Sequence, residues 1–243
     1  MFAKLNRFVK DLILVSGVGY LFYPFRKVLL FLYNLGLLTH WIHRNKRLPA
    51  NTDYFTWGRN YEKRINGFEY ILNRYQLRDQ AFLYMEFGVA SGVSFEWWLQ
   101  HAQHPETTFW GFDTFEGLPE NWGPFYKKGA MAHTEKAYVD TRYRFFKGIF
   151  QDTLADAIEQ NRTLMRREGI KVILLDADLF SSTLFVLSQL YPYLKRGDLI
   201  ILDEFNVPNH EFYAVKLFQE CFYRKLEPVS ALNNFYQTIF EVQ

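Results

Sequence analysis

The most constraining feature of this 243-residue sequence is an alternation, from residue 60 onward, of short apolar runs with longer amphipathic stretches. Such an alternation is typical of βαβ units, in which helices join and cover parallel strands. The strands predicted from it span 82–87, 108–113, 143–147, 171–176 and 198–203. The helices predicted from it span 92–102, 153–167, 182–194 and 210–223, the third ended by Lys195-Arg196-Gly197.

The C-terminal tail adds two shorter strand candidates, 226–230 and 235–241, which suit an antiparallel hairpin at the sheet edge. The expected fold class is therefore α/β: a Rossmann-like, seven-stranded, mostly parallel sheet with an antiparallel edge hairpin, preceded by N-terminal helices. A chain of 243 residues accommodates one such domain with a modest extension and is short for two.

The charge pattern and the cysteine count narrow the function classes. The net charge is +2, and Lys and Arg do not gather into a run interleaved with aromatic residues, so no nucleic-acid partner is predicted. The single cysteine, Cys221, excludes an intrachain disulfide and a cysteine-based zinc site. It lies in an apolar helical stretch with Phe218 and Phe222, which argues against thiol catalysis.

The N-terminal stretch is unusually apolar. Two apolar runs, 12–23 and 28–38, are separated by Pro24, Arg26 and Lys27, and each is shorter than the roughly 20 residues that cross a bilayer. One interpretation is amphipathic helices that pack on the domain or on a second subunit, giving a homo-oligomer. The other is peripheral membrane contact through residues 1–45, with basic residues on anionic lipid. The third interpretation, which the pattern favours least, is a true membrane span.

A polar, basic linker over 43–51 separates this stretch from the rest of the chain. We therefore expect an apolar helical extension over 1–50 and one catalytic-sized domain over 51–243. A cytoplasmic location is expected, with peripheral membrane association left open.

The first predicted strand leads into the turn Glu86-Phe87-Gly88-Val89-Ala90-Ser91-Gly92. Glycines let the backbone approach a ligand closely, and the helix that follows aims its N-terminal amides at it. A dinucleotide-binding turn would carry glycine where Ala90 and Phe95 stand, which weakens the alternative of a nicotinamide-dependent enzyme. Glu86 would repel a pyrophosphate but suits the ammonium and sulfonium groups of S-adenosyl-L-methionine.

Asp113, at the end of the second strand, can accept hydrogen bonds from both ribose hydroxyls of such a cofactor. The alternative interpretation of Glu86 and Asp113 is an ordinary βαβ turn with a surface acid.

Five segments in order resemble the class I methyltransferases grouped with the macrocin and mycinamicin sugar O-methyltransferases. They are EFGVASGVSFEWW (86–98), GFDTFEGLPENW (111–122), KGIFQDTL (147–154), LLDADLFSSTLFVL (174–187) and GDLIILDEF (197–205). The resemblance covers residues 60–243 and leaves the first 50 unexplained.

The resemblance implies a cofactor site for S-adenosyl-L-methionine. Its turn residues are Glu86, Gly88, Ala90, Ser91 and Gly92, with the glutamate and the two glycines at the methionine end. Asp113 would hold the ribose, and Gln151 and Asp152 would lie near the adenine. The alternative for Asp152 is an N-cap of the helix predicted from residue 153.

The resemblance also implies a Mg²⁺ site at Asp176, Asp203 and Glu204, where the family's usual Asp-Asp pair is Asp203-Glu204 here. Carboxylates at neighbouring strand ends are the hard oxygen ligands that Mg²⁺ prefers, and Asp178 is a further candidate. The alternative is a set of structural or substrate-binding carboxylates without metal.

Three residues are candidate catalytic groups: Asp176, His133 and His210. His133 lies in a long segment, 117–141, that reads as a lid over the acceptor; a solvated loop histidine is the alternative. His210 pairs with Glu211 at a helix start, or the two form a plain surface pair. Within the lid, the side chains expected to wall the acceptor pocket are Trp122, Phe125 and Tyr126.

The sequence thus predicts an S-adenosyl-L-methionine-dependent O-methyltransferase that acts on a hydroxyl of a small molecule, a sugar or glycosylated metabolite. The alternative is a membrane-associated or scaffold protein that retains the cofactor-binding fold without turnover.

Overall fold

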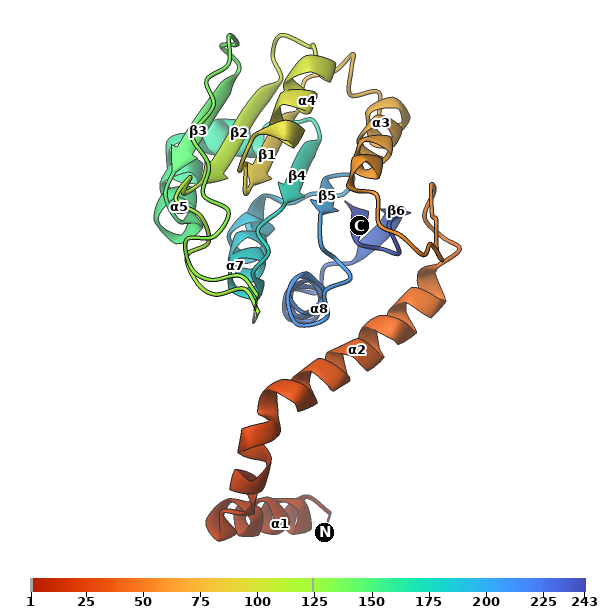
Figure 1. The fold of residues 1–243 in the computed structure, drawn as a ribbon, viewed down its shortest axis with the longest axis vertical. Helices are drawn as coiled ribbons and strands as arrows, with labels where there is room; N and C mark the ends of the chain where they lie inside the picture. Colours follow the sequence, from red (N-terminus) through yellow and green to blue (C-terminus); the bar gives the residue numbers. More distant parts are fainter. Residues whose placement is uncertain (1, 124) are drawn as a thin grey trace.

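The computed structural model describes residues 2–123 and 125–243 and contains one seven-stranded sheet with helices on both faces (Figure 1). The strand order is β3-β2-β1-β4-β5-β7-β6, with β7 antiparallel to both of its neighbours. The order reverses between β1 and β4, which is where ligands bind in open sheets of this type. The predicted fold class, including the edge hairpin, is confirmed.

The five parallel strands match the predicted ranges to within one residue at each end, and β1, β4 and β5 are buried along their whole length. They are β1 (Leu83–Phe87), β2 (Thr108–Asp113), β3 (Tyr143–Lys147), β4 (Lys171–Leu175) and β5 (Leu199–Leu202). The hairpin strands are β6 (Leu226–Leu232) and β7 (Gln237–Val242). The second starts later than predicted because Asn233, Asn234 and Phe235 all adopt positive φ in the turn.

The helices differ more from their predicted ranges. They are α3 (Arg64–Arg74), which the sequence did not predict, α4 (Val93–His101), α5 (Phe150–Gln160), α6 (Arg162–Arg166), α7 (Phe180–Leu190) and α8 (Glu211–Phe222). The single helix predicted over 153–167 is wrong, since the chain breaks at Asn161, whose side-chain amide donates to the Ala157 carbonyl. The predicted end of the helix over 182–194 is also wrong. Pro192 lacks an N–H, and the chain tightens there into a 3₁₀ turn.

Two apolar clusters flank the sheet. One face packs Ile71 of α3 and Trp98 of α4 against the strands. The other packs Leu154 of α5, Leu187 of α7 and Phe218 of α8. The sheet is therefore covered on both faces, and its carboxyl edge remains available for a ligand.

The N-terminal residues form α1 (Phe2–Ser16), a 3₁₀ segment (Val18–Phe25) and α2 (Arg26–Asn45). In Figure 1, α2 runs away from the domain and α1 lies across its far end. The second half of α2 packs on the domain, where the Trp41 ring lies 4.9 Å from Phe205 and 5.6 Å from Phe235, between ring centroids. Residues 26–33, at the start of α2, are exposed.

Candidate functional site

Four strands end at one level and deliver their next residues to a common edge. These residues are Gly88 after β1, Asp113 at the end of β2, Asp176 after β4 and Asp203 after β5. The backbone ladder continues through them. The amides of Gly88 and Asp176 each donate to the neighbouring strand at 2.9 Å, and that of Asp203 donates at 3.2 Å. The sheet register therefore brings the predicted carboxylates together.

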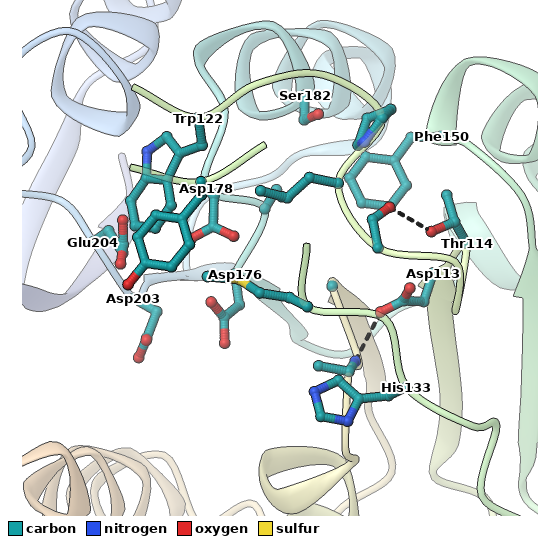
Figure 2. A pocket seen from close by; sticks show the side chains of 18 of the residues that line it. Asp113, Thr114, Trp122, His133, Phe150, Asp176, Asp178, Ser182, Asp203 and Glu204 are labelled. Atoms are coloured by element: carbon teal, nitrogen blue, oxygen red, sulfur yellow. Dashed lines mark hydrogen bonds between the residues drawn. The ribbon is translucent and has the colours of Figure 1, made fainter. Parts of the chain in front are cut away.

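A cavity of about 510 Å³ lies beyond this edge (Figure 2). It is bounded by the turn after β1, the ends of β2, β4 and β5, the start of α5 and the segment 117–141. Its volume lies in the range of small-molecule sites in proteins.

The turn after β1 requires glycine at position 88. Gly88 has φ +95°, and a Cβ built there would lie 1.9 Å from the backbone oxygen of Asp176. No side chain fits at that distance. The backbone of the turn is thereby free to lie against a ligand.

Asp113 is held by two backbone amides. The amide of Ala90 donates to its Oδ2 at 2.7 Å, and that of Phe115 donates to its Oδ1 at 2.6 Å. Both oxygens are therefore fixed in direction, and each keeps a lone pair for a further donor. This arrangement suits the adjacent hydroxyls of a ribose.

The other predicted cofactor residues divide into two groups. Gln151 lines the cavity together with Gly88, Ala90 and Asp113. The residues of the second group do not line the cavity, and they are Glu86, Ser91, Gly92 and Asp152. The N-cap interpretation of Asp152 is wrong, because α5 begins three residues earlier than predicted, with Ile149 as its N-cap residue.

Glu86 lies buried beneath the turn. Its carboxylate accepts a hydrogen bond from the Tyr84 hydroxyl at 2.5 Å, and burial raises its pKa to about 8. Without a bound cation, Glu86 is therefore mostly protonated at neutral pH. A nearby sulfonium or ammonium group would favour its ionised form.

We expect cofactor binding and apoprotein stability to respond to pH in opposite directions. The Glu86 pKa rises from an ordinary 4.5 to about 8 on folding. The free energy of unfolding that this shift contributes is fully present below pH 4.5 and is lost as the pH rises through about 8. Affinity for the cationic cofactor should instead increase as the pH approaches 8. Calorimetric titrations over this range, with thermal melts of the apoprotein, measure both.

In Glu86→Gln both dependences should flatten, because no proton is exchanged at that position. Parallel pH profiles for the variant and the unmodified protein would contradict this account of Glu86.

Arg64 is a site residue that the sequence analysis missed. It begins α3 and lines the cavity, with its Nη1 3.6 Å from Asp176 Oδ2 and 3.7 Å from Asp203 Oδ1. No motif surrounds it. The only available signal was the excess of predicted carboxylates, which requires a compensating cation.

The three predicted Mg²⁺ ligands lie on one side of the cavity, but the Arg64 guanidinium stands between two of them. Among residues 2–123 and 125–243, no three acidic, histidine or cysteine side chains are grouped closely enough to hold a metal ion. As placed, Asp176 and Asp203 fit an arginine rather than a metal.

Glu204 is the third of these acids and is differently surrounded. Its Oε1 accepts a hydrogen bond from Tyr236, whose ring also carries the Arg59 guanidinium at 3.9 Å from the ring centroid. Its Oε2 is buried and without a partner in the described part of the chain. Burial raises the pKa of Glu204 to about 8.

The surface-pair interpretation of His210 and Glu211 is wrong. Glu211 is fully buried, and its Oε2 accepts a hydrogen bond from the Glu204 amide at 2.9 Å. His210 is half-buried behind the cavity wall, with its ring 6.3 Å from that of Trp122. Burial lowers its pKa.

Part of the segment 117–141 lines the cavity and contributes His133, which lies beside Asp113 in Figure 2. Trp122 and Tyr126 line the cavity and stack with ring centroids 4.9 Å apart. Phe125 was wrongly included in this wall. It is 86% exposed.

Asp178 lies between Asp176 and Trp122 in Figure 2 and lines the cavity. It is 9% exposed and has φ +57°, an unusual conformation for a residue other than glycine. Its carboxylate makes no hydrogen bond or ion pair with any residue that the structure describes. Burial raises its pKa to about 6.

Comparison with known proteins agrees with this geometry. The model of the macrocin-O-methyltransferase (TylF) family matches residues 130–234. Demethyldecarbamoylnovobiocin O-methyltransferase of Streptomyces niveus is 26% identical over 119 residues, which are 41% of this chain and 42% of that protein. The match thus spans less than half the length of the curated relative. Over the matched part, the predicted resemblance to this family is confirmed.

Two solved structures share the fold. The calicheamicin methyltransferase CalS11 superposes with a TM-score of 0.55 and 20% identity, over 86% of this chain and 91% of its own. The O-methyltransferase NovP superposes with a TM-score of 0.52 and 19% identity, over 74% of this chain and 79% of its own. The chain therefore has the class I methyltransferase fold.

Proposed function

We propose that this chain is an S-adenosyl-L-methionine-dependent O-methyltransferase that acts on a hydroxyl of a small molecule, a sugar or glycosylated metabolite. The observation that carries the proposal is the alignment of Gly88, Asp113, Asp176 and Asp203 at one sheet edge around a cavity. The matches to macrocin-type and novobiocin O-methyltransferases support the reaction and the acceptor class.

The cofactor would supply a methyl group on a positively charged sulfur. Asp113 would accept hydrogen bonds from the ribose hydroxyls, and Gln151 would lie at the adenine end of the cavity. Glu86, beneath the turn, would provide negative charge for the methionine end without contacting it directly. A pyrophosphate would meet the carboxylates of Asp113 and Asp176 at this edge, and Arg64, which lines the same cavity, already pairs with Asp176 and Asp203.

Methyl transfer is a single displacement, so the protein has to align the acceptor oxygen and remove its proton. We assign the proton-accepting role to Asp178, because it lines the cavity beside Asp176 and no described residue occupies its carboxylate. His133, at the Asp113 side, and His210, behind Trp122, remain the alternative bases.

Replacing Arg64 by glutamine is expected to raise the affinity of the protein for divalent cations. A Mg²⁺ ion at Asp176 and Asp203 would have to displace the guanidinium that lies between them, and the variant removes that competing charge. Titration with MgCl₂, or with Mn²⁺ followed by electron paramagnetic resonance, measures the change. Arg78→Gln, at an exposed position, is the matched control.

Equal or weaker cation binding by Arg64→Gln would show that the predicted ligands do not form a cation site. Treatment of the unmodified enzyme with EDTA tests the catalytic requirement separately. If EDTA abolishes activity and MgCl₂ restores it, the metal has a role in catalysis. If activity is fully retained, Arg64 is the cation that balances Asp176 and Asp203.

The direct test of the proposed function is methyl transfer from radiolabelled cofactor to a panel of nucleotide sugars and glycosides. The proposal expects label in at least one acceptor, with mass spectrometry placing the methyl group on oxygen. Tight cofactor binding without transfer to any member of a broad panel would favour the scaffold alternative.

A further inference from the structure

The N-terminal arm, which we define as residues 2–33, exposes apolar side chains along its whole length. None of residues 2–16 is buried, and the apolar residues of the 3₁₀ segment and of the first two turns of α2 are exposed as well. Contiguous apolar surface of this extent marks an interaction site in a folded protein. The arm therefore has a partner that covers it.

Helix α1 has an apolar face and a basic face. The apolar face carries side chains spaced three or four residues apart, which are Phe2, Leu5, Phe8 and Leu12. Lys4, Arg7 and Lys10, three residues apart, lie on the opposite face. A helix with one broad apolar face and one basic face is suited to lie in the plane of a lipid interface.

The charge distribution selects the partner. Residues 1–52 contain eight Lys or Arg and one Asp, a formal charge of +7, whereas residues 53–243 contain 20 basic and 25 acidic residues, a charge of −5. A second copy that packed its arm against this one would bring another charge of +7 against the first. Anionic lipid headgroups supply the opposite charge instead.

The structure also argues against a membrane span. Val18–Asn45 is long and apolar enough to cross a bilayer by length and composition. However, Leu38 and Ile42 of this stretch pack in the domain core, and the Asn34 side chain donates to Asn209 Oδ1 at 2.9 Å. The part left for lipid is shorter than about 20 residues and carries Arg26 and Lys27 in its middle.

We propose that the N-terminal arm docks this chain on the surface of an anionic bilayer. The apolar face of α1 lies at the acyl boundary, and Lys4, Arg7 and Lys10 meet the headgroups. Because α2 is packed against Phe205 and Phe235 through Trp41, it fixes the orientation of the domain. The parallel strands in Figure 1 point toward the side on which α1 lies, so the cavity faces the membrane.

Flotation of the full chain with lipid vesicles tests this proposal. We expect recovery with phosphatidylcholine vesicles containing phosphatidylglycerol to exceed recovery with phosphatidylcholine alone by roughly tenfold or more, since each basic residue near the surface adds attraction. Leu5→Gln with Leu12→Gln should abolish flotation. The matched control is Leu14→Gln, at an equally exposed apolar position that lies on the basic face of α1.

Cofactor binding by each variant, measured in solution, reports whether its domain is folded. Four outcomes would overturn the proposal. The first is no flotation with either vesicle, and the second is equal loss in Leu14→Gln. The third is a dimer in sedimentation that the Leu5 and Leu12 substitutions dissociate, which would assign the arm to a second copy. The fourth is resistance of the bound chain to extraction with alkaline carbonate, which would show that the arm spans the bilayer.

Discussion

Replacing Asp178 by asparagine is expected to lower kcat by roughly 10²- to 10⁴-fold, the usual contribution of a positioned proton acceptor. The substitution keeps the shape of a side chain that is 9% exposed and lines the cavity beside Asp176. It removes the ability to accept a proton from the acceptor hydroxyl. Affinity for the cofactor should stay unchanged, because Asp113 and the glycine turn are untouched. Steady-state kinetics with an acceptor that the unmodified enzyme methylates and calorimetric titration of the cofactor measure the two effects.

Three companion variants separate the candidate bases. Asp156→Asn, at an exposed position on α5, controls for the loss of one acidic residue. His133→Gln and His210→Gln test the two histidines that the sequence singled out. If Asp178→Asn keeps its kcat and one histidine variant loses most of its own, that histidine is the proton acceptor.

Gly88→Ala is expected to abolish cofactor binding, with a loss of affinity on the order of 10²-fold or more. The added methyl would meet the backbone oxygen of Asp176 at 1.9 Å, and φ of +95° is strained for any residue but glycine. Relief of that contact has to separate the β1 turn from the end of β4. Both the cofactor turn and Asp176, one acid of the cluster, would therefore be displaced.

The control is Gly58→Ala, because a Cβ at Gly58 meets nothing within 4 Å and its φ lies outside the left-handed region. Circular dichroism distinguishes a local change at the turn from loss of the fold. A folded Gly88→Ala protein that binds the cofactor like the unmodified chain would mean that the ligand does not depend on this turn.

The sheet was predictable because its central strands are short apolar runs that no alternative assignment accommodates. The strand register then predicts where the acids lie. Once β1, β2, β4 and β5 pair in parallel, Asp113, Asp176 and Asp203 have to meet at one edge. Glycine and acid positions along the chain were therefore enough to predict where the candidate site lies on the sheet.

The features that sequence reasoning missed depend on side-chain contacts between distant elements. Arg64 stands more than 100 residues from the acids that it neutralises, and no local pattern marks it. Glu211 looked like a surface residue at a helix start, but it is fully buried and accepts a hydrogen bond from the Glu204 amide after β5. The predicted helix limits are wrong where a single residue ends the helix. That residue is Asn161 in one case and Pro192 in the other.

The most direct test of the central claim is a calorimetric titration of the full chain with S-adenosyl-L-methionine and, separately, with a nicotinamide dinucleotide. Micromolar binding of the first, none of the second and loss of the signal in Asp113→Ala is the predicted result. The assignment of this sheet edge to a cationic nucleoside would be contradicted by the absence of binding, or by a preference for the dinucleotide.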